Sequence, residues 1–254
     1  MHQHKFIFIC GLHRSGTSLL YKILKSQSEI SGLSNTGAIE DEGQHLQSIF
    51  KAANKFGGPG KFGFNKASYL DESSELINEE NKKKLFKEWS NYWDLSKTYL
   101  IEKSPPNLVR TRFLQAMFTD AYFITLYRHP AATSLATKKW SKTSLYSLVN
   151  HWLICHNKYL SDRTHLARHL DLKYEDLVSK PDEVFSQIQT FLNTPIERTD
   201  IQIKSGVNDK YFTDWNKRRN NLIHRWDIRK AESKFEDQIN AYNYSFKELM
   251  LAHD

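Results

Sequence analysis

Residues near the N-terminus combine the groups that could hold a phosphate-like anion. Gly11 and Gly16 bracket a short loop, and glycine at both ends allows a tight turn whose backbone N–H groups converge on an oxyanion. Thr17 and Ser18 follow and begin a helix, so the positive end of the helix dipole points the same way. Arg14 lies inside the loop, where a guanidinium can make forked contacts to a sulfate or phosphate. The stretch therefore predicts an anion-binding loop.

The loop has the Gly-x-x-x-x-Gly spacing of a nucleotide P-loop but not its lysine. Thr17 stands where the Gly-Lys-Ser/Thr ending of that motif would require lysine. The basic residue is Arg14 instead, with no sign of the hydroxyl-plus-lysine arrangement that holds Mg-ATP. A P-loop kinase that uses ATP is therefore kept as an alternative, weakened further because no convincing magnesium-binding aspartate ends a strand.

Predicted strands alternate with predicted helices along the chain, and this alternation places the loop. The run at 6–10 is continuously apolar and rich in β formers, as expected for a strand covered on both faces of a parallel sheet. Further strands are predicted at 99–101, 121–127 and 170–174, and helices at 106–118, 132–160 and 181–192. The pattern predicts an α/β fold, a P-loop-like doubly wound parallel sheet flanked by helices, with ligands at the carboxyl ends of the strands. We expect residues 1–254 to form a single domain.

The composition is that of a globular enzyme with a preference for anionic partners. Hydrophobic residues make up 39% and charged residues 26% of the chain, which argues against wholesale disorder. The formal net charge is +7. A nucleotide with several phosphates satisfies this charge, but so would nucleic acid, an acidic glycan or an anionic membrane surface. A basic nucleic-acid-binding module is therefore a second alternative, and it predicts steeply salt-dependent binding to any duplex.

The cysteines and the apolar segments indicate the cellular compartment of the protein. Cys10 and Cys155 are the two cysteines, too few for the disulfide framework of a small secreted domain, so we expect buried free thiols. The N-terminal apolar run is too short for a signal-peptide core. No segment approaches the roughly 20 apolar residues that span a bilayer. The simplest expectation is a soluble cytoplasmic protein.

Two further segments have their own patterns. Residues 56–63 are the most loop-like stretch, and their glycine content favours a mobile flap, which would be either a substrate lid or a plain surface excursion. Residues 73–93 are charged and helical, with Leu85, Trp89 and Trp93 at four-residue spacing, a stripe that predicts a face buried in the core.

The loop resembles that of a known family. The string Arg14-Ser15-Gly16-Thr17-Ser18 looks like the Arg-Ser-Gly-Thr-Thr loop with which sulfotransferases grip the 5′-phosphosulfate of 3′-phosphoadenosine 5′-phosphosulfate (PAPS). The resemblance implies that these residues bind the donor, with Arg14 also serving catalysis.

Two other strand ends resemble the same family. Glu102-Lys103-Ser104-Pro105 is similar to the Glu-Lys-Thr-Pro segment of glycan-type sulfotransferases, which implies that Lys103 is a catalytic, mobile ammonium facing the loop. Arg128 matches the arginine that holds the 3′-phosphate of PAPS.

The serine that partners this arginine in the family is missing. Its position, eight residues after Arg128, is Ala136. On a helix Thr133 and Thr137 lie near the face of Ala136, whereas Ser134 points nearly opposite. Either the lost hydroxyl weakens nucleotide affinity or Thr137 replaces it.

The later segments resemble the family in two places. Tyr174-Glu175-Asp176-Leu177 is similar to its Tyr-Glu-Asp-Leu segment, which supports the fold. The run at 208–215 looks like a late Asn-x-Lys-Tyr…Trp segment that forms a loop over the nucleotide. This likeness implies that Lys210 adds charge to the 3′-phosphate and that Tyr211 covers the adenine.

The general base is the remaining role. In glycan and protein-tyrosine sulfotransferases it is a glutamate some two dozen residues after the loop, a neighbourhood occupied here by Glu40-Asp41-Glu42. Glu42 is our first choice, Glu40 the second and His45 the third, because partial burial in an acidic cluster can poise a carboxylate near the working pH.

Together these residues predict a cytoplasmic PAPS-dependent sulfotransferase. The resemblance implies transfer of a sulfuryl group to an acceptor hydroxyl, release of 3′-phosphoadenosine 5′-phosphate (PAP), and no metal requirement, because arginine and lysine replace the cation of phosphoryl transfer. We expect no nucleic-acid partner. The identity of the acceptor and the oligomeric state stay open.

Overall fold

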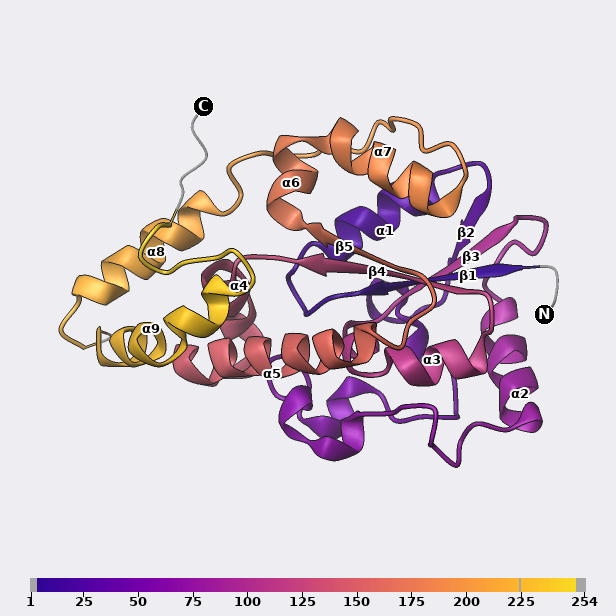
Figure 1. The fold of residues 1–254 in the computed structure, drawn as a ribbon, viewed down its shortest axis with the longest axis horizontal. Helices are drawn as coiled ribbons and strands as arrows, with labels where there is room; N and C mark the ends of the chain where they lie inside the picture. The colour runs from indigo at the N-terminus through magenta and orange to yellow at the C-terminus, as the bar shows by residue number, and fades with distance from the viewer. Residues whose placement is uncertain (1–3, 224, 250–254) are drawn as a thin grey trace.

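A five-stranded parallel sheet forms the centre of the computed structural model, which describes residues 4–223 and 225–249 (Figure 1). The strands are β1 (Lys5–Cys10), β2 (Ile30–Gly32), β3 (Tyr99–Lys103), β4 (Ala121–Tyr127) and β5 (His169–Lys173). Their order in the sheet is β2-β3-β1-β4-β5, and every neighbouring pair is parallel. The predicted doubly wound α/β fold is confirmed, with β1 between β3 and β4.

Alternate residues of β1 pack into two separate hydrophobic cores. Phe6, Phe8 and Cys10 face one core, and Ile7 and Ile9 face the other. All are buried, because helices cover both faces of the sheet and successive side chains of a strand point to opposite faces. The continuous apolar run in the sequence thus reflects two-sided burial.

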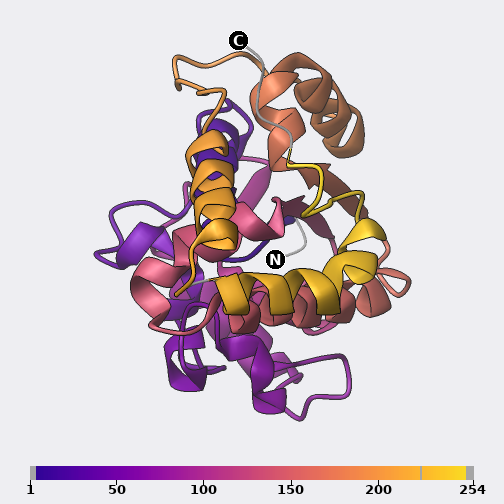
Figure 2. The same cartoon turned by 90° about the vertical axis from the view of Figure 1, so that its left-hand side faces the viewer.

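Helices flank the sheet and also gather beyond the carboxyl ends of its strands (Figure 1). One face is covered by α1 (Thr17–Lys25), α6 (Tyr174–Ser179) and α7 (Pro181–Leu192). The other face is covered by α2 (Glu79–Ser90), α3 (Thr111–Met117) and α5 (Leu145–Arg163). Beyond the strand ends lie α4 (Pro130–Ser141), α8 (Asp209–Asn220) and α9 (Arg225–Asn240), which are nearest the viewer in Figure 2.

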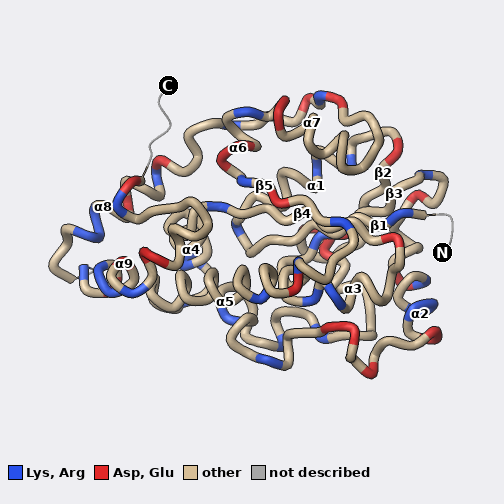
Figure 3. Tube along the Cα trace, viewed as in Figure 1, with Lys and Arg blue, Asp and Glu red and all other residues tan. Residues whose placement is uncertain are grey.

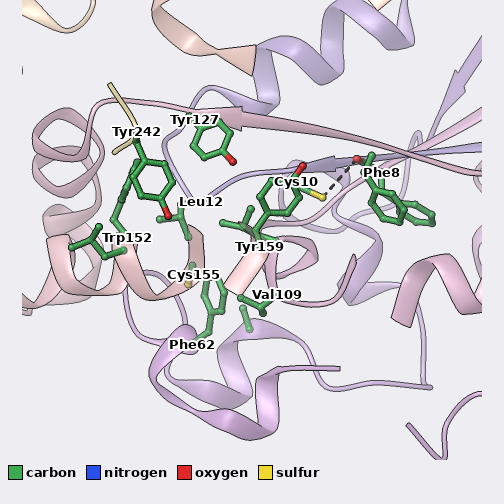
Figure 4. Close-up of a cluster of buried hydrophobic side chains, with 14 of the residues drawn as sticks. Phe8, Cys10, Leu12, Phe62, Val109, Tyr127, Trp152, Cys155, Tyr159 and Tyr242 are labelled. Atoms are coloured by element: carbon green, nitrogen blue, oxygen red, sulfur yellow. Dashed lines mark hydrogen bonds between the residues drawn. The ribbon is translucent and has the colours of Figure 1, made fainter. Parts of the chain in front are cut away.

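Figure 4 shows the core below the end of β1. Cys10 and Leu12 lie there close to Tyr159 and Cys155 of α5 and to Phe62. Both cysteines are free and fully buried, as predicted. Within the described ranges no helix is both long and apolar enough to cross a membrane.

The predicted strands and helices are present, with the following differences in this part of the chain. The interval 132–160 holds two helices, because the chain turns at Lys142, whose φ is 48°. The interval 106–118 begins with a 3-10 turn at Pro105–Val109 before α3. The short strand β2 was not predicted, because three residues at the sheet edge carry no periodic signal.

The charged segment at 73–93 forms α2 over part of its length, Glu79–Ser90. Leu85, Trp89 and Trp93 are buried in the core with Phe8, so the predicted core stripe is confirmed.

The glycine-rich segment at 56–63 is packed rather than free. Phe62 is fully buried, and the backbone N–H of Gly63 donates to His151 Nε2 of α5 at 3.1 Å. Gly60 approaches Leu148 of the same helix so closely that a Cβ would lie 2.3 Å from its Cδ2. The prediction of a mobile flap is therefore wrong, because these glycines serve close packing. We call residues 53–60 the glycine-rich wall below.

This close packing leads to a test of stability. A Cβ on Gly63 would lie 2.3 Å from Cys155 Sγ, so we expect Gly63→Ala to lower the free energy of unfolding by about 1–3 kcal/mol through overpacking. Cys155→Ala removes the sulfur, and in the double variant the new methyl group gains room. Denaturant unfolding should therefore give a double variant more stable than the sum of the single losses predicts, by about 0.5 kcal/mol or more. Strictly additive losses would contradict this packing.

Candidate active site

Three neighbouring strands deliver the predicted site to one edge of the sheet. The loop at 11–16 follows β1, Lys103 ends β3, and Arg128 follows β4. Since β3, β1 and β4 are adjacent and parallel, their carboxyl ends meet, and the chain order reverses there. Ligands of open α/β sheets bind at this position.

The loop after β1 has the backbone of an anion cradle. Gly16 has a φ of 96° and Arg14 a φ of 68°, the left-handed region that favours glycine. A Cβ on Gly16 would lie 2.3 Å from the ring of Tyr174. Ser15 is buried, and its Oγ has no hydrogen-bond partner.

A cavity of about 620 Å³ adjoins this loop. It lies within the size range of small-molecule sites. Predicted site residues that line it are Arg14, Gly16, Thr17, Ser18, Glu40, Glu42, His45, Lys103 and Arg128. Ser15, Lys210 and Tyr211 do not line it. The structure therefore brings together the loop, the strand ends and the three base candidates.

Lys103 and Glu42 form a buried ion pair in this cavity. Lys103 Nζ lies 3.1 Å from Glu42 Oε1, and the two side chains are 2% and 10% exposed. Gln44 Nε2 donates to the other oxygen, Oε2, at 2.5 Å. His45 Nε2 is 3.8 Å from the same atom. The mobile ammonium predicted for Lys103 is thus a fixed one, because Glu42 holds it.

The backbone next to Glu42 is fixed from two sides. Gly43 N donates to Glu102 Oε1 at 2.9 Å, and Gly43 O accepts from the indole of Trp89 at 2.9 Å. Burial raises the pKa of Glu102, while hydrogen bonds from Ser104 and Asn107 lower it. A Cβ on Gly43 would lie 2.6 Å from Glu102 Cγ. The fixed backbone of Gly43 therefore holds Glu42 beside the carboxyl end of β3.

The base candidates differ in burial. Glu42 is 7% exposed, whereas Glu40 and His45 are exposed. Only Glu42 is paired with Lys103.

Arg128 is a second buried cation of the site. Its Nε donates to Asn208 Oδ1 and its Nη1 to the carbonyl of Arg14, both at 2.8 Å. The guanidinium lies 4.3 Å from the ring of Tyr174 and 5.3 Å from that of Tyr211. Burial lowers its pKa. Its Nη2 is buried without a partner, so this group has hydrogen-bonding capacity left for an anion.

Helix α4 shows what surrounds the missing serine. Ala136 is buried. Thr137 Oγ1 donates to the carbonyl of His13 at 3.3 Å, so its hydroxyl supports the loop. Ser134 lines a separate small cavity together with Thr133 and Thr137, so this cavity does not test its predicted direction. One turn after Ala136, Trp140 lies over the Arg14 guanidinium at 5.0 Å.

Several residues of the site were not predicted. Trp140 lines the cavity, and its four-residue spacing from Ala136 could have indicated it. Asn208 was part of a recognised segment, but its contact with Arg128 crosses 80 residues of sequence. The segment at 208–215 is mostly helical, in α8, and not the predicted loop. Tyr211 is buried against Arg128, whereas Lys210 is exposed.

The loop also holds a buried imidazole. Burial and, to a smaller extent, the positive charge of Lys103 lower the pKa of His13 to about 3, so the ring is neutral at ordinary pH. Among the residues that the structure describes, no group of three or more His, Cys, Asp or Glu side chains could hold a metal ion.

Fold and site together define a P-loop-like α/β protein whose loop after β1 carries arginine in place of lysine. A family model described as "Sulfotransferase family" matches residues 7–198. The chain belongs to the sulfotransferase family and is therefore an enzyme that transfers sulfuryl groups. Neither the kinase nor the nucleic-acid-binding alternative finds support. Figure 3 shows basic positions spread over most elements with acidic positions among them.

Solved structures support the fold. The sulfotransferase domain from the curacin biosynthetic pathway gives a TM-score of 0.54 at 16% identity, covering 95% of this chain and 98% of that one. The sulfotransferase domain of the Synechococcus PCC 7002 olefin synthase gives 0.54 at 19% identity, with 92% and 96% covered. Sulfotransferase STF9 from Mycobacterium avium gives 0.54 at 13% identity, with 96% and 78% covered. No curated protein matches the sequence.

The residue after Arg128 leads to a prediction on acid stability. His129 Nδ1 accepts from the N–H of Ala131 at 3.1 Å and thereby caps α4, while Nε2 lies 3.1 Å from the carbonyl of Ser245. This pattern requires a neutral ring. Burial lowers the pKa of His129 to about 4, so the unfolded chain takes up a proton below about pH 6.5 that the folded chain refuses. The resulting stability is complete above that pH and is lost as the pH falls toward 4.

We expect the titration of His129 to make the free energy of unfolding about 1 kcal/mol lower at pH 5.5 than at pH 7.5. His129→Asn keeps a capping oxygen but cannot titrate. Its unfolding free energy should therefore decrease by about 1 kcal/mol less than that of the wild type between pH 7.5 and 5.5. His165, an exposed histidine, provides the control variant His165→Asn. Denaturant unfolding at both pH values measures the difference, and equal acid losses in wild type and His129→Asn would contradict the assignment.

Proposed function

We propose that this sulfotransferase uses PAPS as donor and a hydroxyl group as acceptor. The observation that carries the proposal is the convergence of Arg14, Lys103 and Arg128 on one cavity beside a backbone cradle. A donor with a 5′-phosphosulfate and a separate 3′-phosphate needs two anion sites, and this arrangement offers both. The unpaired atom Arg128 Nη2 is a free partner that such a ligand would satisfy.

Each cation would have its own task. Arg14 and the backbone N–H groups of residues 15–18 would hold the 5′-phosphosulfate at the start of α1. Arg128, fixed by Asn208 and by the Arg14 carbonyl, would hold the 3′-phosphate. Tyr211 would act through Arg128, whose guanidinium it covers. Lys210, exposed beside it, would add long-range attraction for the nucleotide.

Glu42 would serve as the base. It would take the proton of the acceptor hydroxyl while the acceptor oxygen forms a bond to sulfur and the bond from sulfur to the 5′-phosphate oxygen breaks. The electron pair of that bond stays on the phosphate oxygen of PAP, where the Lys103 ammonium would stabilise it. The ion pair between Glu42 and Lys103 supports this assignment, because it keeps base and cation adjacent and leaves Lys103 further N–H donors. Glu40 and His45 would then only line the mouth.

Other properties stay predictions. We propose that residues 1–254 act as one domain, in the cytoplasm, without a nucleic-acid partner. Activity should persist in EDTA, because three cations surround the proposed transfer point. A strict Mg²⁺ requirement would contradict this proposal.

Donor binding provides the main test. In one calorimetric series PAP should bind, whereas ATP and a DNA duplex should bind at least tenfold more weakly. Arg14→Ala removes charge-assisted hydrogen bonds worth about 1.5–3 kcal/mol, so its affinity for PAP should fall by about 10- to 100-fold. Arg198, exposed and paired with Asp182, gives the control Arg198→Ala, for which no change is expected. Wild-type affinity for PAP in Arg14→Ala would overturn the proposal.

The base assignment has a separate test. Glu42→Gln keeps the size of the side chain but cannot take a proton, so we expect kcat to fall by about 10²- to 10⁴-fold with PAP affinity within a few-fold of wild type. Glu40→Gln should retain most of the activity. The reverse order of effects would assign the base to Glu40.

A further inference from the structure

The cavity has a second wall that donor binding does not require, and this wall bears on the acceptor. The loop, Arg128 and Tyr174 form part of its lining. The rest of the lining includes Ala53, Asn54, Gly58 and Pro59 of the glycine-rich wall, together with Ile39, Pro105 and Trp140, of which Trp140 also contacts the Arg14 guanidinium. We call this set the second wall. The proposed base and Lys103 belong to the same cavity. An acceptor that presents its hydroxyl to Glu42 would therefore rest on this second wall.

The large side chains of the second wall are apolar and uncovered. Ile39 is 79% exposed and Trp140 57% exposed, although both line the cavity. Exposed apolar side chains at the mouth of a concave site mark a surface that a ligand covers. Pro59 and Pro105 contribute further apolar area and no backbone N–H donor.

The buried polar side chains near this wall have partners within the protein. Gln44 donates to Glu42 and accepts from the N–H of Ala53, and Lys103 is paired with Glu42. Asn54, Glu40 and His45 are the exposed polar side chains that line the cavity. A saccharide would need a directional partner for each of several hydroxyls, and unpaired hydroxyls cost affinity.

Charge at the mouth argues against acidic acceptors. Glu40 and Glu42 both line the cavity. Lys103 balances the charge of Glu42, so a carboxylate or sulfate on the acceptor would meet the repulsion of Glu40. This feature disfavours acidic glycans and tyrosines flanked by acidic residues.

We propose that the acceptor is an uncharged apolar alcohol, aliphatic or aromatic, whose body packs on Ile39, Trp140 and Pro59 while its hydroxyl reaches Glu42. This inference rests on the proposed function and specifies the substrate class of the same site. The transfer step is unchanged: the acceptor oxygen bonds to sulfur, its proton goes to Glu42, and PAP leaves with the electron pair.

The test measures transfer from PAPS to four probes: 1-butanol, 1-octanol, 2-naphthol and lactose. Burial of each added CH₂ should raise kcat/KM by about fourfold along the alkyl series, the equivalent of about 0.8 kcal/mol per CH₂. 1-Octanol and 2-naphthol should therefore exceed lactose by at least 100-fold. Lactose equal to or better than 1-octanol, or no transfer to any apolar probe, would overturn the inference.

A matched pair of variants locates the apolar contact. Ile39→Ser removes an exposed isoleucine of the second wall, and Ile223→Ser removes one that is 83% exposed and does not line the cavity. Ile39→Ser should raise KM for 1-octanol about tenfold with little change in kcat, whereas Ile223→Ser should change neither. Equal effects of the two variants would overturn the inference.

PAP calorimetry on the same samples separates two kinds of failure. Normal PAP affinity together with preference for lactose refutes the apolar acceptor and leaves the donor assignment standing. Loss of PAP binding in the wild-type protein refutes the proposed function, and the acceptor inference falls with it.

Discussion

A single buried guanidinium ties the parts of this site together. Arg128 bridges the end of β4 to the loop after β1 by donating to the Arg14 carbonyl, at a residue whose backbone is in the left-handed region. Removing a guanidinium from water costs free energy unless its N–H groups find partners. Asn208 supplies one such partner, and the rings of Tyr174 and Tyr211 cover the plane of the guanidinium. The cost is thus met by groups from three distant segments, which positions a charge before any ligand arrives.

A second network has the same logic on the other side of β1. The carboxyl of Glu102 is fully buried, yet it accepts hydrogen bonds from Ser104, Asn107 and the backbone of Gly43. This set holds the backbone beside Glu42, so the ion pair with Lys103 does not depend on flexible side chains alone. Site and scaffold are therefore one hydrogen-bonded unit, in which most polar groups have structural partners and a few are left free.

The sequence predicted those parts of the molecule whose signal is local. The apolar runs at 6–10 and 121–127 marked buried parallel strands, and the glycines of the loop marked a required backbone conformation, so the meeting of three strand ends followed from topology. Contacts between distant segments left no such signal. The helix that contains Tyr211 was predicted to be a loop from its likeness to a family segment, although Tyr211, Phe212 and Trp215 have helical spacing. The spacing of Trp140 from Ala136 indicates a shared helix face, but it does not show that the Trp140 ring contacts Arg14. The packing of residues 56–63 against α5 could not be predicted either, because a high glycine content is found both in mobile loops and in closely packed ones.

The way the glycine-rich wall is anchored limits how this enzyme can diverge. Gly60 and Gly63 lie so close to side chains of α5 that a larger residue would require Leu148 or Cys155 to shift. Substitution there would lower stability, which limits how far selectivity can change at these positions. Positions such as Ile39, which no packing constrains, are free to vary. Diversification within a lineage of this protein should therefore concentrate at the rim, while the floor of the cavity stays constant.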